Sequence, residues 1–235
     1  AARYWSGPLP TEVREGRTYL YLGSAAGLSM TPAWTADPVD RGSAFFGCSV
    51  ASAGDVNGDG LGDVIIGAYN YRGEADWEGR AYLYFGSVSG PSPNASWTAD
   101  PTDQPGAAFS IGSAGAGDVN GDGFDDVVIG ASNFTGSATS EGRAYLYLGA
   151  GSGLAANPAW TADPVDQAEA YFGYVVASAG DVNGDGFADV VTGAQGFDGE
   201  AQDEGRAYLY LGGPGGLSPS PAWTADPTDQ AQARF

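Results

Sequence analysis

The sequence predicts an all-β protein, a β-propeller built from four-stranded antiparallel blades of 63 residues, with about 3.7 blades in this chain. The first observation is composition: 43% of the 235 residues are hydrophobic, 39 are glycine and 14 are proline, which indicates a turn-dense fold with a real core. The second is an internal repeat, because aromatic residues recur every 63 residues with no shift in register. The third is that no segment has the 3.6-residue apolar period of a helix. The recurring aromatic positions are Trp34, Trp97, Trp160 and Trp223, then Tyr19, Tyr82, Tyr145 and Tyr208, then Phe46, Phe109, Phe172 and Phe235.

Each repeat is expected to contain four short strands separated by Gly, Pro, Asn or Asp. In the first complete unit these strands are predicted at 46–51, 63–68, 80–86 and 95–99. The second strand, Asp63-Val-Ile-Ile-Gly-Ala, is a continuous apolar run of the kind that is buried on both faces. Such strands need sheets stacked on both sides, and radial repetition of four-stranded sheets provides them. A β-sandwich would alternate more cleanly and would not need a 63-residue period.

The repeat period divides the chain into units that open at the recurring phenylalanine. We expect a partial blade with strands two to four over 1–45, complete blades over 46–108, 109–171 and 172–234, and the start of another blade at 235. All units are expected to form one propeller domain or an arc of one. An arc cut from a longer propeller is the favoured arrangement. The alternatives are a four-bladed ring with one defective blade, or two chains that complete a ring together.

The most specific signal lies between strands one and two. The loops read DVNGDGLGD over 55–63, DVNGDGFDD over 118–126 and DVNGDGFAD over 181–189. Oxygen-bearing side chains fall at loop positions 1, 3, 5 and 9, and a backbone carbonyl at position 7 would complete the set that Ca²⁺ prefers. We therefore expect three calcium ions, one in each loop. The expected ligands are Asp55, Asn57, Asp59, Leu61 and Asp63 in the first loop, Asp118, Asn120, Asp122, Phe124 and Asp126 in the second, and Asp181, Asn183, Asp185, Phe187 and Asp189 in the third.

Two other interpretations of these loops compete with a propeller calcium site. An EF-hand or dockerin shares the first half of the pattern, but it needs an acidic residue at position 12, where this chain has Ile66, Ile129 and Thr192. The second competing interpretation is a plain Asp/Asn/Gly turn that binds no metal. It would crowd three carboxylates into each loop, each pair repelling by up to about 4 kcal/mol at 4 Å and an effective dielectric constant near 20. A cost of that kind in all three loops favours the metal.

The loops and their flanks resemble a known family. Phe-Gly at Phe46 and Phe172, the D-x-N-x-D-G-x-x-D loops and the I-G-A or T-G-A that follows are similar to the FG-GAP repeat, the blade of integrin α-subunit propellers and of many bacterial surface and secreted proteins. The match covers the three complete units and most of the leading one. The second unit departs from it at Ser110, and the proline of GAP is replaced in every unit. The resemblance implies a propeller, usually seven-bladed, with calcium between strands one and two, and adhesion or protein recognition.

Composition excludes several function classes. The chain has no His, and its nine basic residues are all Arg, so a Ser-His-Asp triad, a Schiff-base lysine and a P-loop lysine are all excluded. The net charge of -20 disfavours nucleic acid and anionic membranes as partners, and no apolar run is long enough to span a bilayer. We expect no membrane insertion.

We expect a calcium-stabilised interaction module rather than an enzyme. Its place would be extracellular or at the cell surface, and its partner a protein or glycan bound in adhesion or recognition. Self-association that completes the propeller is a further expected interaction. The alternative is a non-catalytic or carboxylate-based propeller portion of a secreted hydrolase or lyase, since paired carboxylates suffice for glycosidase chemistry.

The ligand face is expected opposite the metal loops. In an up-and-down blade the loops after strands one and three emerge on one face, and the loops after strands two and four on the other. The loops after strand two diverge most between units, and variable loops on a rigid scaffold commonly carry recognition. The first of them contains the candidates Tyr69, Tyr71, Arg72 and Trp77, residue types frequent in binding hot spots. The alternative is that these aromatic side chains fold back onto the blade.

Overall fold

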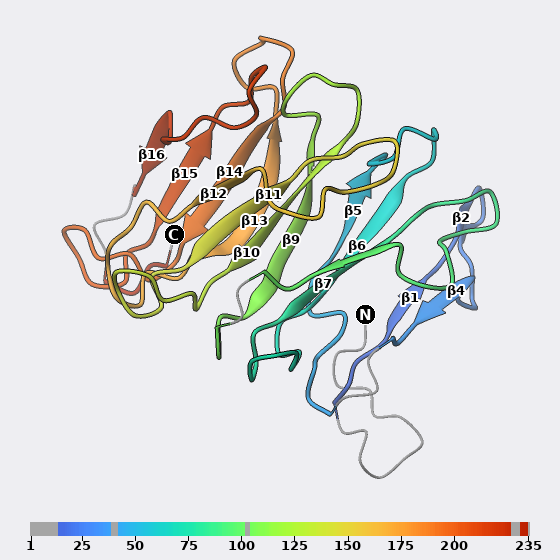
Figure 1. The fold of residues 1–235 in the computed structure, drawn as a ribbon, viewed down its shortest axis with the longest axis horizontal. Coiled ribbons are helices and arrows are strands. Elements are labelled where there is room, and N and C mark those ends of the chain that lie inside the picture. Colours follow the sequence, from blue (N-terminus) through green and yellow to red (C-terminus); the bar gives the residue numbers. More distant parts are fainter. Residues whose placement is uncertain (1–13, 39–41, 102–103, 227–230, 235) are drawn as a thin grey trace.

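The computed structural model describes residues 14–38, 42–101, 104–226 and 231–234, and the regular structure in these ranges is all β-strand (Figure 1). Three four-stranded antiparallel sheets follow one another along the chain, each with its strands paired in sequence order. This confirms the propeller blades predicted from the repeat. The first blade contains β5 (Val50–Gly54), β6 (Asp63–Ala68), β7 (Arg80–Tyr84) and β8 (Trp97–Ala99). The second blade contains β9 (Phe109–Gly117), β10 (Asp126–Ala131), β11 (Arg143–Tyr147) and β12 (Trp160–Ala162), and the third blade β13 (Phe172–Gly180), β14 (Asp189–Ala194), β15 (Arg206–Tyr210) and β16 (Trp223–Ala225).

The leading unit is smaller than expected within the described residues. Strands β1 (Thr18–Leu20) and β4 (Trp34–Ala36) form a two-stranded antiparallel sheet and correspond to strands three and four of the repeat. A short hairpin of β2 (Gly23–Ser24) and β3 (Gly27–Leu28) lies between them in sequence. The strand two that we predicted for this unit falls within 1–13, outside the described residues.

Strand one of the first blade begins later than predicted. The expected strand at 46–51 is observed as β5, which starts at Val50. Phe45 and Gly47 have φ values of +56° and +84°, so the backbone on both sides of Phe46 is left-handed and not extended. In the second and third blades, β9 and β13 do begin at the phenylalanine, and both are interrupted by register shifts against strand two. Strand three of the three blades ends at Tyr84, Tyr147 and Tyr210, and in the first blade this is before Gly86, which we had included in the predicted strand.

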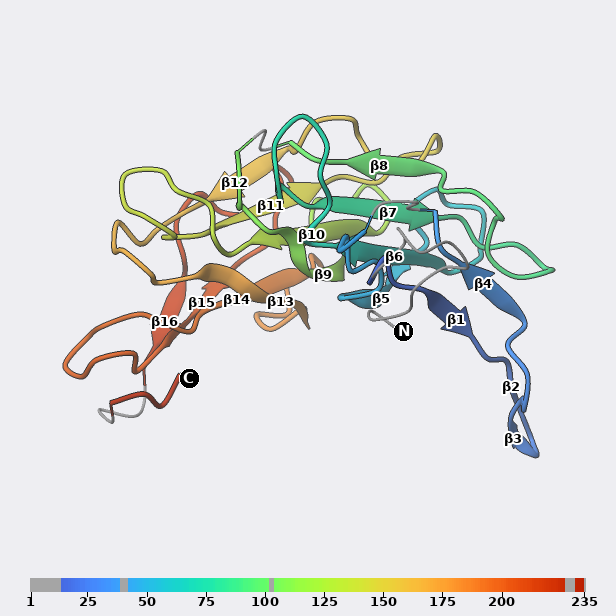
Figure 2. The same cartoon turned by 90° about the horizontal axis from the view of Figure 1, so that it is seen from below.

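Burial of the second strands follows from packing between blades. Every residue of β10, in the middle blade, is buried, as its apolar sequence predicts. Two residues of β14, which belongs to the last blade, are only half-buried. Figure 2 shows why: the sheets stand side by side along an arc, with the leading unit at one end and the third blade at the other. Among the described residues, the second blade is covered on both sides, whereas each end of the arc is covered on one side only.

Candidate metal-binding loops

The predicted metal loops connect strands one and two of each complete blade, at one edge of the arc. In the first loop the Asp55 carboxylate accepts hydrogen bonds from the backbone N–H groups of Asp59 at 3.0 Å and Gly60 at 2.8 Å. The side-chain oxygen of Asn57 also accepts from Asp59 N–H at 3.0 Å, and Asp59 Oδ1 accepts from Leu61 N–H at 2.9 Å. The oxygen-bearing side chains at positions 1, 3 and 5 are thus turned inward over their own loop.

The other two loops repeat this geometry. Asp118 and Asp181 each accept from three backbone N–H groups at 2.7–3.1 Å. Loop glycines at positions 4 and 6 have φ values between +72° and +92°, where a side chain would be strained. Hydrogen bonds from the Gly186 amide above all lower the pKa of Asp181, so this exposed carboxylate is ionised at neutral pH. Three copies of one loop conformation therefore present the same oxygen-rich surface.

The position-nine carboxylates have a second role that we did not predict. Asp126 is fully buried, and its two oxygens accept from the backbone N–H groups of Val119 and Gly149, both at 2.9 Å. Asp63 and Asp189 make the equivalent pairs at 2.7–3.0 Å. Burial raises the pKa of Asp126 to about 6 and also raises that of Asp63. These carboxylates tie the metal loop to the turn that follows strand three. A glycine follows YLYL or YLYF in every unit, and this recurrence is the sequence feature from which the contact could have been predicted.

The loops offer the right donor chemistry without a finished metal centre. Across the described residues, no three His, Cys, Asp or Glu side chains form a ready-made metal-binding group. In each loop the Asn at position 3 donates its side-chain N–H to the Asp at position 5, at 2.8–3.1 Å. The accessible donors are nevertheless carboxylate, amide and carbonyl oxygens, the set that a hard cation such as Ca²⁺ takes and that softer metals do not select. The residues present fit the ion.

The four ligand-face candidates differ in how far their side chains are exposed to solvent. Tyr71 is only 8% exposed, and the Arg80 guanidinium lies over its ring, 4.0 Å from the centroid. Phe134 and Phe197, at the same repeat position, lie under Arg143 and Arg206 at 3.8 Å. Tyr71 therefore packs on its blade and is not available to a surface partner.

The remaining candidates are more accessible. Tyr69 is half-buried and stacks on Phe45, with ring centroids 5.4 Å apart. Trp77 is 45% exposed, and the exposed Arg72 guanidinium lies 5.1 Å from its ring centroid. Arg72 and Trp77 thus form an exposed cation–π pair on the loop between β6 and β7.

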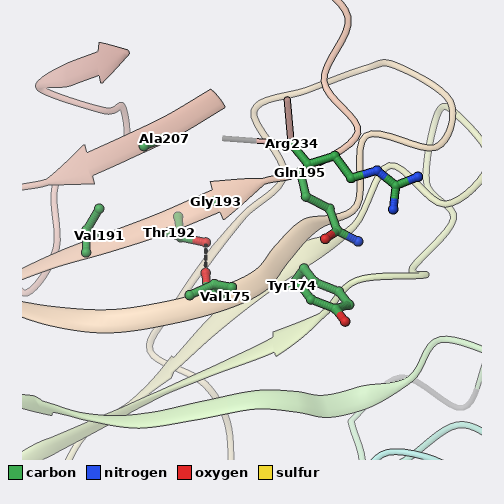
Figure 3. A pocket seen from close by; sticks show the side chains of 8 residues that line it. All are labelled: Tyr174, Val175, Val191, Thr192, Gly193, Gln195, Ala207 and Arg234. Carbon is green, nitrogen blue, oxygen red and sulfur yellow. Dashed lines mark hydrogen bonds between the residues drawn. The ribbon is translucent and has the colours of Figure 1, made fainter. Parts of the chain in front are cut away.

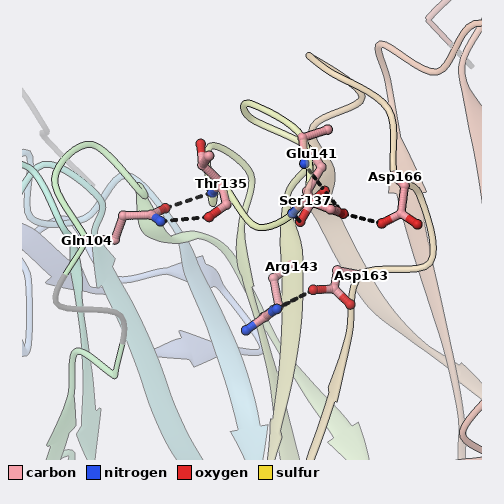
Figure 4. Close-up of polar contacts among 8 residues, drawn as sticks. Gln104, Thr135, Ser137, Glu141, Arg143, Asp163 and Asp166 are labelled. Atoms are coloured by element: carbon pink, nitrogen blue, oxygen red, sulfur yellow. Dashed lines mark hydrogen bonds and ion pairs between the residues drawn. The ribbon is translucent and has the colours of Figure 1, made fainter.

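Polar side chains that the sequence analysis missed hold the loops after strand two in place (Figure 4). The buried Glu141 accepts hydrogen bonds from the backbone N–H of Ala138 at 2.8 Å and from the Ser137 hydroxyl at 3.1 Å. Between blades, Gln104 donates to the Thr135 carbonyl at 2.8 Å and accepts from the Thr135 N–H at 2.7 Å. Gln167 makes the same reciprocal pair with Asp198. The recurrence of Glu-Gly-Arg and Asp-Gln in the repeats was the signal for both contacts.

A family model described as FG-GAP repeat matches residues 46–84, 111–147 and 172–210. The chain is similar to integrin alpha-IIb of Mus musculus, 33% identical over 158 residues that cover 65% of this chain and 15% of that protein. It is also similar to integrin alpha-E of Mus musculus, with 37% identity covering 64% and 13%, and to integrin alpha-5 of Xenopus laevis, with 31% identity covering 75% and 17%. The chain thus spans less than a fifth of these relatives.

These matches indicate no catalytic family. In the described ranges, no helix has the length and apolar character needed to cross a membrane.

Proposed function

Because the chain carries three FG-GAP repeats and is similar to integrin α subunits, we propose that it is a calcium-stabilised β-propeller module for adhesion or recognition. It acts outside the cell or at the cell surface, where its partner is a protein or a glycan. Its blades over 46–108, 109–171 and 172–234 form, with the partial blade over 1–45, one propeller domain or an arc of one. The observation that carries the proposal is the threefold recurrence of one oxygen-lined loop conformation.

Calcium has a clear physical role in these loops. Each loop places two accessible carboxylates and a side-chain amide oxygen within five residues, in a chain whose net charge is -20. The backbone carbonyl at position seven is a fourth donor. The position-nine carboxylate is a fifth, because each of its oxygens has a second lone pair beyond its hydrogen bond to a backbone N–H. A divalent ion bound there would offset two of the three negative charges of the loop's Asp ligands and fix the loop's position relative to the blade. The residues that would hold it are the fifteen expected from the sequence.

Calcium titration of the protein stripped of metal tests the stoichiometry. Isothermal titration calorimetry should report three ions per chain, and Asp59→Ala should reduce this to two, because it removes the position-five ligand of one loop only. The matched control is Glu74→Ala, which deletes an exposed carboxylate in the loop between β6 and β7. It should leave three ions bound. Three ions in the Asp59→Ala protein, or none in the wild type, would contradict the assignment.

The partner-binding surface is proposed at Arg72 and Trp77, on the face opposite the metal loops. Arrays of glycans and matrix proteins, screened with and without calcium, would identify the partner. Against that partner, combined Arg72→Ala and Trp77→Ala should weaken binding at least about tenfold with little change in melting temperature, since exposed Arg and Trp are frequent hot-spot residues.

The matched variant is Tyr71→Ala in the same loop. It should lower the free energy of unfolding by about 3 kcal/mol, because it empties the space under Arg80. If the protein with both Arg72→Ala and Trp77→Ala bound its partner as well as the wild type does, the partner site would lie elsewhere on the protein.

A further inference from the structure

A stacked pair of aromatic rings fills one position of the first complete blade. Phe45 stands directly before the phenylalanine that opens the repeat, and Tyr69 directly follows strand two. Their ring centroids are 5.4 Å apart, and the ring planes lie within 7° of parallel. We call the place that these two repeat positions occupy in each blade the ring slot. It lies at the end of the blade from which the loop after strand two emerges.

The second blade has small residues in the ring slot. Ala108 and Ser132 stand 63 residues after Phe45 and Tyr69. Ala108 has the same left-handed φ of +56° as Phe45, so the backbone there repeats that of the first blade. Two aromatic rings are thus replaced by a methyl group and a hydroxymethyl group on an equivalent main chain.

A hollow of about 270 Å³ lies at these small residues. A tyrosine from each adjacent blade lines it, Tyr69 from the first and Tyr174 from the third. Figure 3 shows Tyr174 beside Gln195, the third-blade counterpart of Ser132. The hollow lies between three consecutive described blades and is not part of the outer face of either end of the arc. Its volume is just below the roughly 300 Å³ at which small-molecule sites begin, which suits a single ring.

The hollow joins the aromatic lining to an amide with spare donors. Asn133 is exposed and lines the hollow, and its Oδ1 accepts a hydrogen bond from the buried Ser132 hydroxyl at 3.2 Å. The side-chain NH₂ group of Asn133 has no hydrogen-bond partner among the described residues. Its first-blade counterpart, Asn70, instead donates to the Ser43 carbonyl at 2.7 Å. The residues that line the hollow carry no charge, so their chemistry selects a neutral ligand.

We propose that the ring slot of the second blade binds a hexopyranose ring of a neutral glycan. A pyranose carries C–H groups on its faces, which pack on the electron-rich faces of aromatic rings such as Tyr69 and Tyr174. Hydroxyl groups on its edge both donate and accept hydrogen bonds. They match the NH₂ group of Asn133 and the hydroxyl oxygen of Ser132. A phenylalanine side chain of a protein partner has the same size, but it would cover the Asn133 amide without pairing it.

This inference rests on the proposed recognition function, because it names the chemical class of a partner on the same face. Ligand-observed NMR tests it with single sugars. Saturation-transfer difference spectra of the calcium-saturated protein are recorded with the methyl glycosides of glucose, galactose, mannose and N-acetylglucosamine. At least one should bind, with a dissociation constant on the order of 1 mM, as expected for a ligand of one small ring. N-acetyl-tyrosinamide, the probe for a protein side chain, should give no signal.

The repeat itself supplies the blocking variant. Ala108→Phe combined with Ser132→Tyr installs the aromatic pair of the first blade, so it should abolish sugar binding without lowering the melting temperature. Asn133→Ala should weaken sugar binding about threefold to tenfold, since it removes the donors for the sugar hydroxyls. Asn94→Ala is the matched control, because it deletes an exposed amide in the loop between β7 and β8. It should bind sugar as the wild type does.

Circular dichroism and melting temperature establish that each variant is folded. If the filled variant does not fold, Asn133→Ala decides alone, because its side chain is exposed. Three results would overturn the proposal: no glycoside binds, sugar binding survives in the folded filled variant or is unchanged in Asn133→Ala, or N-acetyl-tyrosinamide binds and no glycoside does. Sugar binding without any partner on the glycan and protein arrays would support the slot and contradict the recognition function. A protein partner without sugar binding would do the reverse.

Discussion

Removal of calcium is expected to lower the melting temperature by about 15–30 °C. A ligand that binds only the folded state stabilises it by about 2.7 kcal/mol when its free concentration is 100 times Kd. Three independent loops would then contribute about 8 kcal/mol, which is comparable with the whole stability of an ordinary domain. For a chain of this size each kcal/mol corresponds to roughly 2–4 °C. Differential scanning calorimetry in excess calcium and in excess EGTA measures the difference directly.

The direction of this effect follows from the charge in the loops. Without a cation, the carboxylates at positions 1 and 5 lie within one short turn and repel each other, and their backbone hydrogen bonds only partly offset that repulsion. Asp122→Ala should therefore reduce the calcium-dependent part of the stability by about a third, whereas Glu74→Ala should leave it intact. Re-addition of calcium after EGTA should restore the original melting temperature. Equal melting temperatures with calcium and with EGTA would show that the loops are ordinary turns.

The blade architecture could be predicted because the repeat constrains it. A strict period means that every unit must pack on its neighbours in the same way, and only a few folds allow this. The apolar run of strand two then required cover on both faces, and the fully buried β10 has it. The loop between strands one and two was recognisable because its oxygen-bearing residues and glycines have fixed spacing within nine residues.

Features that depend on partners distant in sequence could not be predicted. Asp63 was expected as a metal ligand, and nothing in its loop sequence indicates that its Oδ1 also accepts a hydrogen bond from the Gly86 N–H, 23 residues later. Tyr71 looked like a surface hot-spot residue, but its ring lies under Arg80 from the following strand. In each case residue type and spacing give the chemistry of the side chain, whereas its direction is set by a contact that only the folded sheet creates.

Gly130→Ala is expected to be among the most damaging single-methyl changes in the chain. A Cβ at Gly130 would meet the backbone carbonyl oxygen of Gly173 in the next blade far inside 3.0 Å, a separation below which real Cβ atoms are essentially never found. The obstacle is main chain in a buried sheet, so two blades would have to move apart. We expect a loss of about 3 kcal/mol or more in the free energy of unfolding, at or above the upper end of ordinary overpacking. Urea denaturation with calcium present gives the value.

The repeat supplies a matched control at Gly193, the same position in the third blade. Among the described residues, no atom lies within 4 Å of a Cβ built there, and its backbone is outside the positive-φ region. Gly193→Ala should leave stability unchanged or raise it by up to about 1 kcal/mol, since alanine restricts the unfolded chain more than glycine does. If both variants lost the same stability, the cause would be the sheet itself and not the contact between blades.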